Sequence, residues 1–169
     1  MTMVNGTELR EALTDGQLEI LLRNGKLGPW SVASVPNLRV RTNSPRFLAV
    51  EIDVLESVTN SAGNLHGGAA ATIADVVTTA ALLAADPRPS VSSDLHCTFV
   101  SSAPVGSVIV AEASVDHVGR SLLFSSCRIY TGDGEGRSLV ATALHTKKVV
   151  GERFVGLGED LSDSLRSKL

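Results

Sequence analysis

The order of apolar and polar positions divides the chain into elements of helical and of extended character. Residues 7–25 place leucines at helical spacing and end at an Asn-Gly stop signal, which predicts a helix. Residues 28–37 (GPWSVASVPN) predict a loop or an irregular strand. Residues 47–57 (FLAVEIDVLES) alternate with a period of two, as a half-buried strand does. Four later runs are rich in Val, Ile, Leu, Thr or Phe and predict four more strands, at residues 91–100, 107–118, 121–130 and 138–150.

The longest apolar run, residues 67–85 (GGAAATIADVVTTAALLAA), predicts one long helix. Two glycines open it, and prolines at positions 87 and 89 end it, because proline cannot continue a helix. Nearly all of its faces are apolar, so we expect burial by the chain's own sheet and by a partner subunit. We do not expect a membrane span, because the run is rich in Ala and Thr and contains a central aspartate.

Short turn sequences between the later runs predict an antiparallel sheet. One apolar helix with about five such strands indicates an α+β domain whose sheet wraps the helix. The length of 169 residues suits a single domain of this kind. We divide the chain into an N-terminal helical segment (1–28), the main domain (29–150) and a C-terminal tail (151–169).

Charge and cysteine content exclude several functions. The net charge is −3 and the pI about 5.8, so no basic surface indicates nucleic-acid binding. Cys97 and Cys127 are too few for a disulfide framework and lack the spacing of zinc ligands, which fits a reducing compartment. Residues 167–169 read Ser-Lys-Leu, a peroxisomal address. In a eukaryote we therefore expect import through the peroxisomal receptor, and otherwise a cytoplasmic protein.

Asp75 stands alone in the middle of the apolar helix. Burying a carboxylate is costly unless partners satisfy it, and no Lys or Arg lies three or four residues away. A structural, hydrogen-bonded aspartate is one interpretation. The other is chemical, because a half-buried carboxylate can act as a general base toward water or attack directly. The helix N-terminus supplies the oxyanion hole for such a reaction, since free N–H groups there lie at Gly67 and Gly68, which have no side chain.

One chain cannot easily bring both groups to a single carbonyl. Asp75 lies eight residues beyond Gly67, which is about 12 Å along the helix at a rise of about 1.5 Å per residue. Two such helices, antiparallel around a two-fold axis, place Asp75 of one copy beside Gly67 of the other. The sequence therefore predicts an isologous dimer with two shared sites.

Four stretches of the chain carry a familiar pattern: TNSAGNLHGGAAATIAD, VSSDLHCTFVSSAPVG, VGRSLLFSSCRI and ATALHTKKV. Together they resemble the small hotdog-fold acyl-CoA thioesterases of the phenylacetate-type group, over residues 46–150. The resemblance implies a hotdog fold, in which a curved antiparallel sheet of five to six strands wraps a long central helix, and assembly into homodimers and usually homotetramers. It also implies hydrolysis of acyl-CoA to free acid and CoA, and we expect a fatty acyl group of medium to long chain length. No metal or organic cofactor is implied, because the carboxylate and the helix N-terminus suffice.

The resemblance assigns a role to five residues. Asp75 activates water, or attacks, at the thioester carbonyl. Ser92 orients the water or the carboxylate. Asn60 and the backbone amide of Gly67 polarise the carbonyl, and His66 lies near the thioester sulfur, where it helps the leaving thiol.

Several of these residues also have a plain structural interpretation. Asn60 can shape a turn, and His66 can satisfy backbone groups at the helix N-terminus. Another serine of the SVSSD run can take the place of Ser92. Strand alternation further predicts that Ser92 and Asp94 share one face of their strand and that Ser93 takes the other.

Because CoA carries phosphates, we expect cationic contacts at the mouth of the site. The residues expected to bind substrate are Gly68, Arg120, His145, Lys147 and Lys148. Solvated surface charges are the alternative for the cations among them. The family often has a basic residue before the histidine of its HTK motif, whereas this chain has Leu144, which weakens the case for a basic contact there.

Two other functions can use the same residues. A hotdog hydratase or dehydratase would use His66 and Asp75 to move a proton on carbon, although Asn60, Gly67 and Ser92 fit carbonyl polarisation better. A non-catalytic acyl-CoA-binding protein would keep the scaffold without turnover. Release of thiol from acyl-CoA separates an enzyme from a binding protein.

Overall fold

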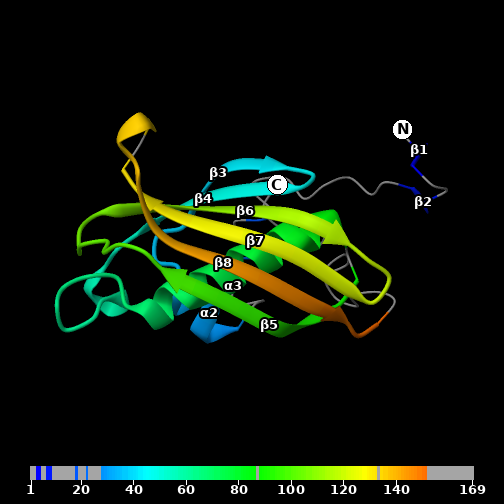
Figure 1. Cartoon of the computed structure of the whole chain (residues 1–169), viewed down its shortest axis with the longest axis horizontal. Helices are drawn as coiled ribbons and strands as arrows, with labels where there is room; N and C mark the ends of the chain where they lie inside the picture. The colour runs from blue at the N-terminus through cyan, green and yellow to red at the C-terminus, as the bar shows by residue number, and fades with distance from the viewer. Residues whose placement is uncertain are drawn as a thin grey trace, which may run out of the picture.

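The chain folds into a curved sheet with one long helix packed against one of its faces (Figure 1). The computed structural model describes residues 3–4, 7–8, 18, 22, 28–86, 88–132 and 134–151. The predicted peroxisomal address at residues 167–169 lies outside these residues, as does most of the helix predicted at residues 7–25.

Six strands form one sheet in which every neighbouring pair is antiparallel. Their order across the sheet is β3–β4–β6–β7–β8–β5. The strands are β3 (Arg39–Ser44), β4 (Phe47–Asp53), β5 (Ser90–Phe99), β6 (Val108–Val118), β7 (Leu122–Thr131) and β8 (Ser138–Val149). A separate pair consists of β1 (Met3–Val4) and β2 (Thr7–Glu8). The predicted α+β class, with its antiparallel sheet, is confirmed.

The long helix α3 spans Gly67–Ala85, as predicted. Its buried side consists mostly of Ala, Val, Ile and Leu and packs against β4, β6, β7 and β8. The other side, which includes Asp75 and Thr79, is half-buried in the single chain. Within the described ranges, α3 is the one helix long and apolar enough to cross a membrane, and core helices of soluble proteins pass the same test.

The region before the sheet differs from the prediction. Residues 28–37 contain a short helix, α2 (Pro29–Ser34), where the sequence predicts a loop or an irregular strand. Proline suits the first helical position, because the N–H that it lacks has no helical partner there. The hydroxyl of Ser34 also donates to the carbonyl of Trp30 at 2.9 Å, which closes the last turn.

The helix predicted at residues 7–25 is found only in part. Leu18 and Leu22 are helical and buried. Thr7–Glu8 instead form β2, because they pair with Met3–Val4 in an antiparallel register.

Two strands also need correction. The strand predicted at residues 47–57 ends at Asp53, because the 3-10 turn η1 (Glu56–Val58) follows it. The sequence interpretation misses β3, an edge strand whose side chains are half-buried or exposed and therefore carry little hydrophobic pattern.

Candidate active site

The Asp75 carboxylate lies in a cluster of polar side chains from three elements. Its members are Asp75, Thr78 and Thr79 of α3, Ser92 of β5, and His145 and Lys147 of β8. The cluster forms where α3 passes over the paired strands β5 and β8, in which Ser92 lies opposite Lys147. Segments far apart in the sequence thus meet around one carboxylate.

Asp75 is anchored on one side and open on the other. Its side chain is 43% exposed. Oδ1 lies 3.3 Å from the hydroxyl oxygens of both Thr79 and Ser92. Two nitrogens lie slightly farther from Oδ1: His145 Nε2 at 3.5 Å and Lys147 Nζ at 3.8 Å. All four contacts involve Oδ1, so Oδ2 takes part in none of them.

His145 is deeply buried, with 1% of its surface exposed. Nδ1 lies 2.7 Å from Thr78 Oγ1, and Nε2 lies 2.9 Å from Ser92 Oγ. Burial, followed by the charge of Lys147, lowers the pKa of His145 to about 4, against the opposing effect of nearby carboxylates. The ring is therefore neutral at physiological pH.

Lys147 is also buried, with 5% of its surface exposed. Nζ donates to Thr79 Oγ1 at 2.9 Å and to Ser92 Oγ at 3.1 Å. Burial lowers the pKa of Lys147, and the charge of Asp75 opposes that shift. Lys147 lies inside the cluster and not at an open mouth, because the alternation of β8 turns it inward together with His145. A substrate contact at either residue stays a prediction.

A β-bulge decides which way Ser92 faces. Ser92 pairs with Lys147 of β8 and Asp94 pairs with Thr146, so Ser93 is an extra residue in β5. Lys147 and Thr146 are consecutive in β8 and therefore face opposite sides of the sheet. Their partners Ser92 and Asp94 also face opposite sides. The prediction that Ser92 and Asp94 share a face is therefore wrong, because the bulge interrupts the alternation.

The first residue of α3 has a backbone donor without a partner among the described residues. Gly67 is the first residue of the helix, and in the part of the chain that the structure describes its N–H has no acceptor. The N–H of Gly68 instead donates to His66 Nδ1 at 2.9 Å, so it is not free for a substrate. His66 is thus the N-cap of α3. In a neutral ring whose Nδ1 accepts, Nε2 carries the proton, so exposed His66 offers an N–H to a ligand.

Asn60 shapes the turn before the helix, as its structural interpretation predicts. Its Oδ1 accepts from the N–H groups of Ala62 at 3.0 Å and Asn64 at 3.2 Å. The side-chain amide nitrogen takes no part in these bonds, and the residue is exposed. Asn60 therefore holds its turn with one atom and leaves the other for a ligand.

Two of the expected CoA contacts lie apart from the cluster. Arg120 is exposed in the turn between β6 and β7, where its carbonyl accepts from Arg88 Nη1 at 2.8 Å. Lys148 is exposed on the face of β8 opposite to that of Lys147. A CoA contact at either residue stays a prediction.

Comparison with known proteins identifies the family. The Thioesterase superfamily profile matches residues 62–138. Human acyl-coenzyme A thioesterase 13 is 39% identical over 105 residues, which make up 62% of this chain and 74% of that protein. The chain belongs to the thioesterase superfamily.

Solved structures in this superfamily share the fold. Zebrafish thioesterase superfamily member 2 superposes with a TM-score of 0.74 at 29% identity, covering 82% of this chain and 99% of the other. Mouse thioesterase superfamily member 2 gives a TM-score of 0.70 at 30% identity, covering 83% of this chain and all of the other. The hotdog fold and the family resemblance are thus confirmed.

The sequence interpretation of this superfamily member missed two residues of the cluster. Thr79 lies one helical turn after Asp75 and donates to it, and Thr78 contacts His145. Their spacing of three and four residues from Asp75 is the available signal, since such positions share a helix face. The residues that the structure describes contain no group of three or more His, Cys, Asp or Glu side chains that could hold a metal ion.

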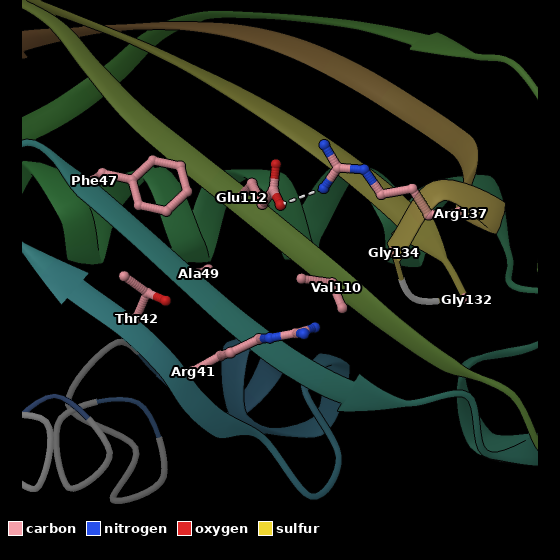
Figure 2. Close-up of a pocket in the computed structure, with 9 residues that line it drawn as sticks. All are labelled: Arg41, Thr42, Phe47, Ala49, Val110, Glu112, Gly132, Gly134 and Arg137. Atoms are coloured by element: carbon pink, nitrogen blue, oxygen red, sulfur yellow. Dashed lines mark hydrogen bonds and ion pairs between the residues drawn. The ribbon is translucent and has the colours of Figure 1, made fainter.

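A hollow of about 450 Å³ lies on the face of the sheet opposite to α3 (Figure 2). Arg41 and Arg137 border it, together with Glu112. Arg137 forms an ion pair with Glu112 at 2.6 Å and lies 4.0 Å from the centre of the Tyr130 ring. These contacts already satisfy the Arg137 cation, and no member of the Asp75 cluster lines the hollow.

Proposed function

We propose that this chain is an acyl-CoA thioesterase that hydrolyses the thioester of acyl-CoA to a free acid and CoA. The observation that carries the proposal is the Asp75 carboxylate, which is anchored on one oxygen, half-exposed, and set in a helix whose first N–H is free. Membership of the thioesterase superfamily supports the reaction type. The name of the human relative, acyl-coenzyme A thioesterase 13, supports the substrate class.

In the proposed reaction, Asp75 removes a proton from water as the water oxygen bonds to the thioester carbonyl carbon. The N–H of Gly67 and the side-chain amide of Asn60 stabilise the negative charge that develops on the carbonyl oxygen. Collapse of the tetrahedral intermediate breaks the C–S bond. The departing sulfur takes up the proton that Asp75 removed, and the N–H of His66 stabilises the sulfur by a hydrogen bond. Each step uses side chains and backbone groups of the protein.

Each site in this proposal is shared between two copies of the chain. Ser92, near the start of β5, contacts Asp75, whereas Phe99, at the end of β5, lies against Gly67, where an added Cβ would be 3.5 Å from the Phe99 ring. β5 is a ten-residue edge strand with exposed apolar side chains, and such an edge favours pairing with a further strand. Antiparallel pairing of two β5 strands would bring Asp75 of one copy toward Gly67 of the partner subunit.

The proposal extends to both ends of the substrate. We expect an aliphatic acyl group, because aromatic residues are only 4% of the chain and few rings are available to hold an aryl group. A medium to long chain length stays a prediction. The exposed cations Arg120 and Lys148 are candidates for contacts with CoA phosphates. Assembly into a homotetramer and import into peroxisomes stay predictions.

Release of free thiol from a panel of acyl-CoAs, short to long and including aryl groups, tests the proposed function. The protein should release thiol, and Asp75→Asn should lower kcat by about 10²–10⁴-fold, because the general base is lost. Asp116→Asn makes the same chemical change at an exposed carboxylate of β6 and should keep full activity.

Two outcomes would contradict the proposal in different ways. A wild-type protein that binds acyl-CoA without releasing thiol would be a binding protein. An Asp75→Asn variant that hydrolyses at the wild-type rate would show that another group activates the water.

A further inference from the structure

The cluster around Asp75 contains a buried lysine that the proposed reaction does not use. Lys147 Nζ faces three oxygens: Thr79 Oγ1 at 2.9 Å, Ser92 Oγ at 3.1 Å and Asp75 Oδ1 at 3.8 Å. Lysine is almost never this deeply buried unless it is paired, because removing an ammonium group from water is costly. Its placement therefore depends on these three acceptors, one of which is the proposed general base.

The short contacts of Thr78 determine where the neighbouring protons lie. Thr78 Oγ1 is 2.6 Å from the carbonyl oxygen of Ala74, and two oxygens at that distance need a proton between them. Thr78 therefore donates to Ala74 and can only accept from His145 Nδ1, which is 2.7 Å away. This pattern assigns the Nδ1–H tautomer to the neutral His145 ring.

Ser92 is then left with one lone pair on its open side, since Lys147 donates to the other. Because Nε2 of the neutral His145 ring is an acceptor 2.9 Å away, Ser92 gives it its single proton. The Ser92 oxygen, 3.3 Å from Asp75 Oδ1, then has no proton for the carboxylate. Lys147 supplies the missing donors. It donates to Ser92 directly, and it donates to Thr79, which in turn donates to Asp75.

We propose that Lys147 is a positioning residue for thioester hydrolysis, an inference that rests on the proposed function. Its ammonium group fixes Ser92 with a lone pair turned toward the water that Asp75 activates. Its positive charge also attracts the Asp75 carboxylate, 3.8 Å away. The water then finds one acceptor for each of its protons, on Asp75 and on Ser92, and its oxygen is directed at the thioester carbonyl.

Among the titratable groups near the cluster, Lys147 is the positive charge that faces Asp75. His145 is neutral, because burial lowers its pKa to about 4. On β5, burial and the charge of Asp75 raise the pKa of the Cys97 thiol, so the thiol is protonated. Asp94, also on β5, adds a second negative charge that acts on His145.

The variant Lys147→Met keeps the length of the side chain and removes its charge. We expect kcat to fall at least about tenfold, with KM within about twofold of wild type. A fall in kcat at unchanged KM marks a positioning role, because a general loss of structure would raise KM as well.

Two further variants serve as comparisons. Lys148→Met removes the adjacent, exposed cation from the same strand and should leave kcat in place, with any loss appearing in KM. Thr79→Val removes the hydroxyl between Lys147 and Asp75 and should lower kcat by a smaller factor in the same direction. Thr79→Val also keeps the inference testable if Lys147→Met does not fold.

An NMR titration of the Lys147 side chain separates this inference from the proposed function, because it needs no turnover. The pKa of Lys147 should fall further in Asp75→Asn, because the charge of Asp75 opposes its lowering in the wild type. An unmoved Lys147 pKa in Asp75→Asn, or a raised KM with unchanged kcat in Lys147→Met, would overturn the positioning role in an otherwise active enzyme. A wild-type protein that releases no thiol, while its Asp75→Asn variant shows the lowered Lys147 pKa, would refute the proposed function alone.

Discussion

Two residues near the start of α3 combine a structural and a chemical role. His66 caps the helix with Nδ1, and this bond leaves the proton on Nε2. Asn60 holds its turn with Oδ1 and keeps its amide N–H groups free of that turn. The structural and functional interpretations that the sequence leaves open are therefore compatible at both positions, because different atoms of one side chain serve each role.

The buried His145 ring should couple stability to pH. Its pKa of about 4 in the folded protein lies below the ordinary value of about 6.5, so the unfolded chain binds the proton first as the pH falls. This group should have no effect above about pH 6.5 and should lower the free energy of unfolding by up to about 3 kcal/mol between about pH 6.5 and 4. Urea unfolding of wild type and His145→Asn at several pH values measures the difference, and parallel pH dependences would contradict a neutral buried ring.

Among the elements, β8 shows what strand alternation can and cannot predict. Ala141 and Ala143 are buried, and a period of two then places His145 and Lys147 on the same inward face. The sequence therefore contains the signal for an inward-facing Lys147. We instead expected this residue at the mouth of the site, because CoA carries phosphates. The bulge at Ser93 could not be predicted, because an extra residue in one strand is defined only by its register with the partner strand.

The turn between β6 and β7 should depend on a glycine. A Cβ at Gly119 would lie 2.7 Å from the carbonyl oxygen of Leu122, which is closer than a side chain tolerates. Gly119→Ala should therefore lower the free energy of unfolding by about 1–3 kcal/mol, as overpacking does. Gly136→Ala, where no atom lies within 4 Å of the added Cβ, is the matched control and should change it by less than about 0.5 kcal/mol. Equal, small changes in urea unfolding would contradict this account of the turn.

For the whole molecule, the sequence predicts the main elements because strong local signals bound them. Glycines and prolines set the limits of α3, and turn sequences separate the last three strands. The short elements α2 and β3 lack such signals and depend on packing against the rest of the fold. The site itself could be predicted only in part, because β5 follows α3 in the chain but pairs with β8, and this distant pairing brings Ser92 and Lys147 to Asp75.

The central claim is that Asp75 and Gly67 of two different copies act on one carbonyl. Gly67→Pro removes the backbone N–H at a position that accepts proline, since it is the first helical residue and His66 before it is extended, with φ −66° and ψ 134°. The loss of one oxyanion donor should lower kcat by about 10²-fold or more. Gly67→Ala keeps the N–H, places its Cβ at an ordinary 3.5 Å from Phe99, and should lose less activity.

The most direct test mixes Asp75→Asn with Gly67→Pro after joint unfolding and refolding, and measures thiol release from an acyl-CoA. Each variant alone should be nearly inactive. The mixture should regain about a quarter of wild-type activity, because about half of the dimers are mixed and each mixed dimer has one intact shared site. Activity that stays at the level of the separate variants would show that a single chain supplies both groups and would contradict the shared site.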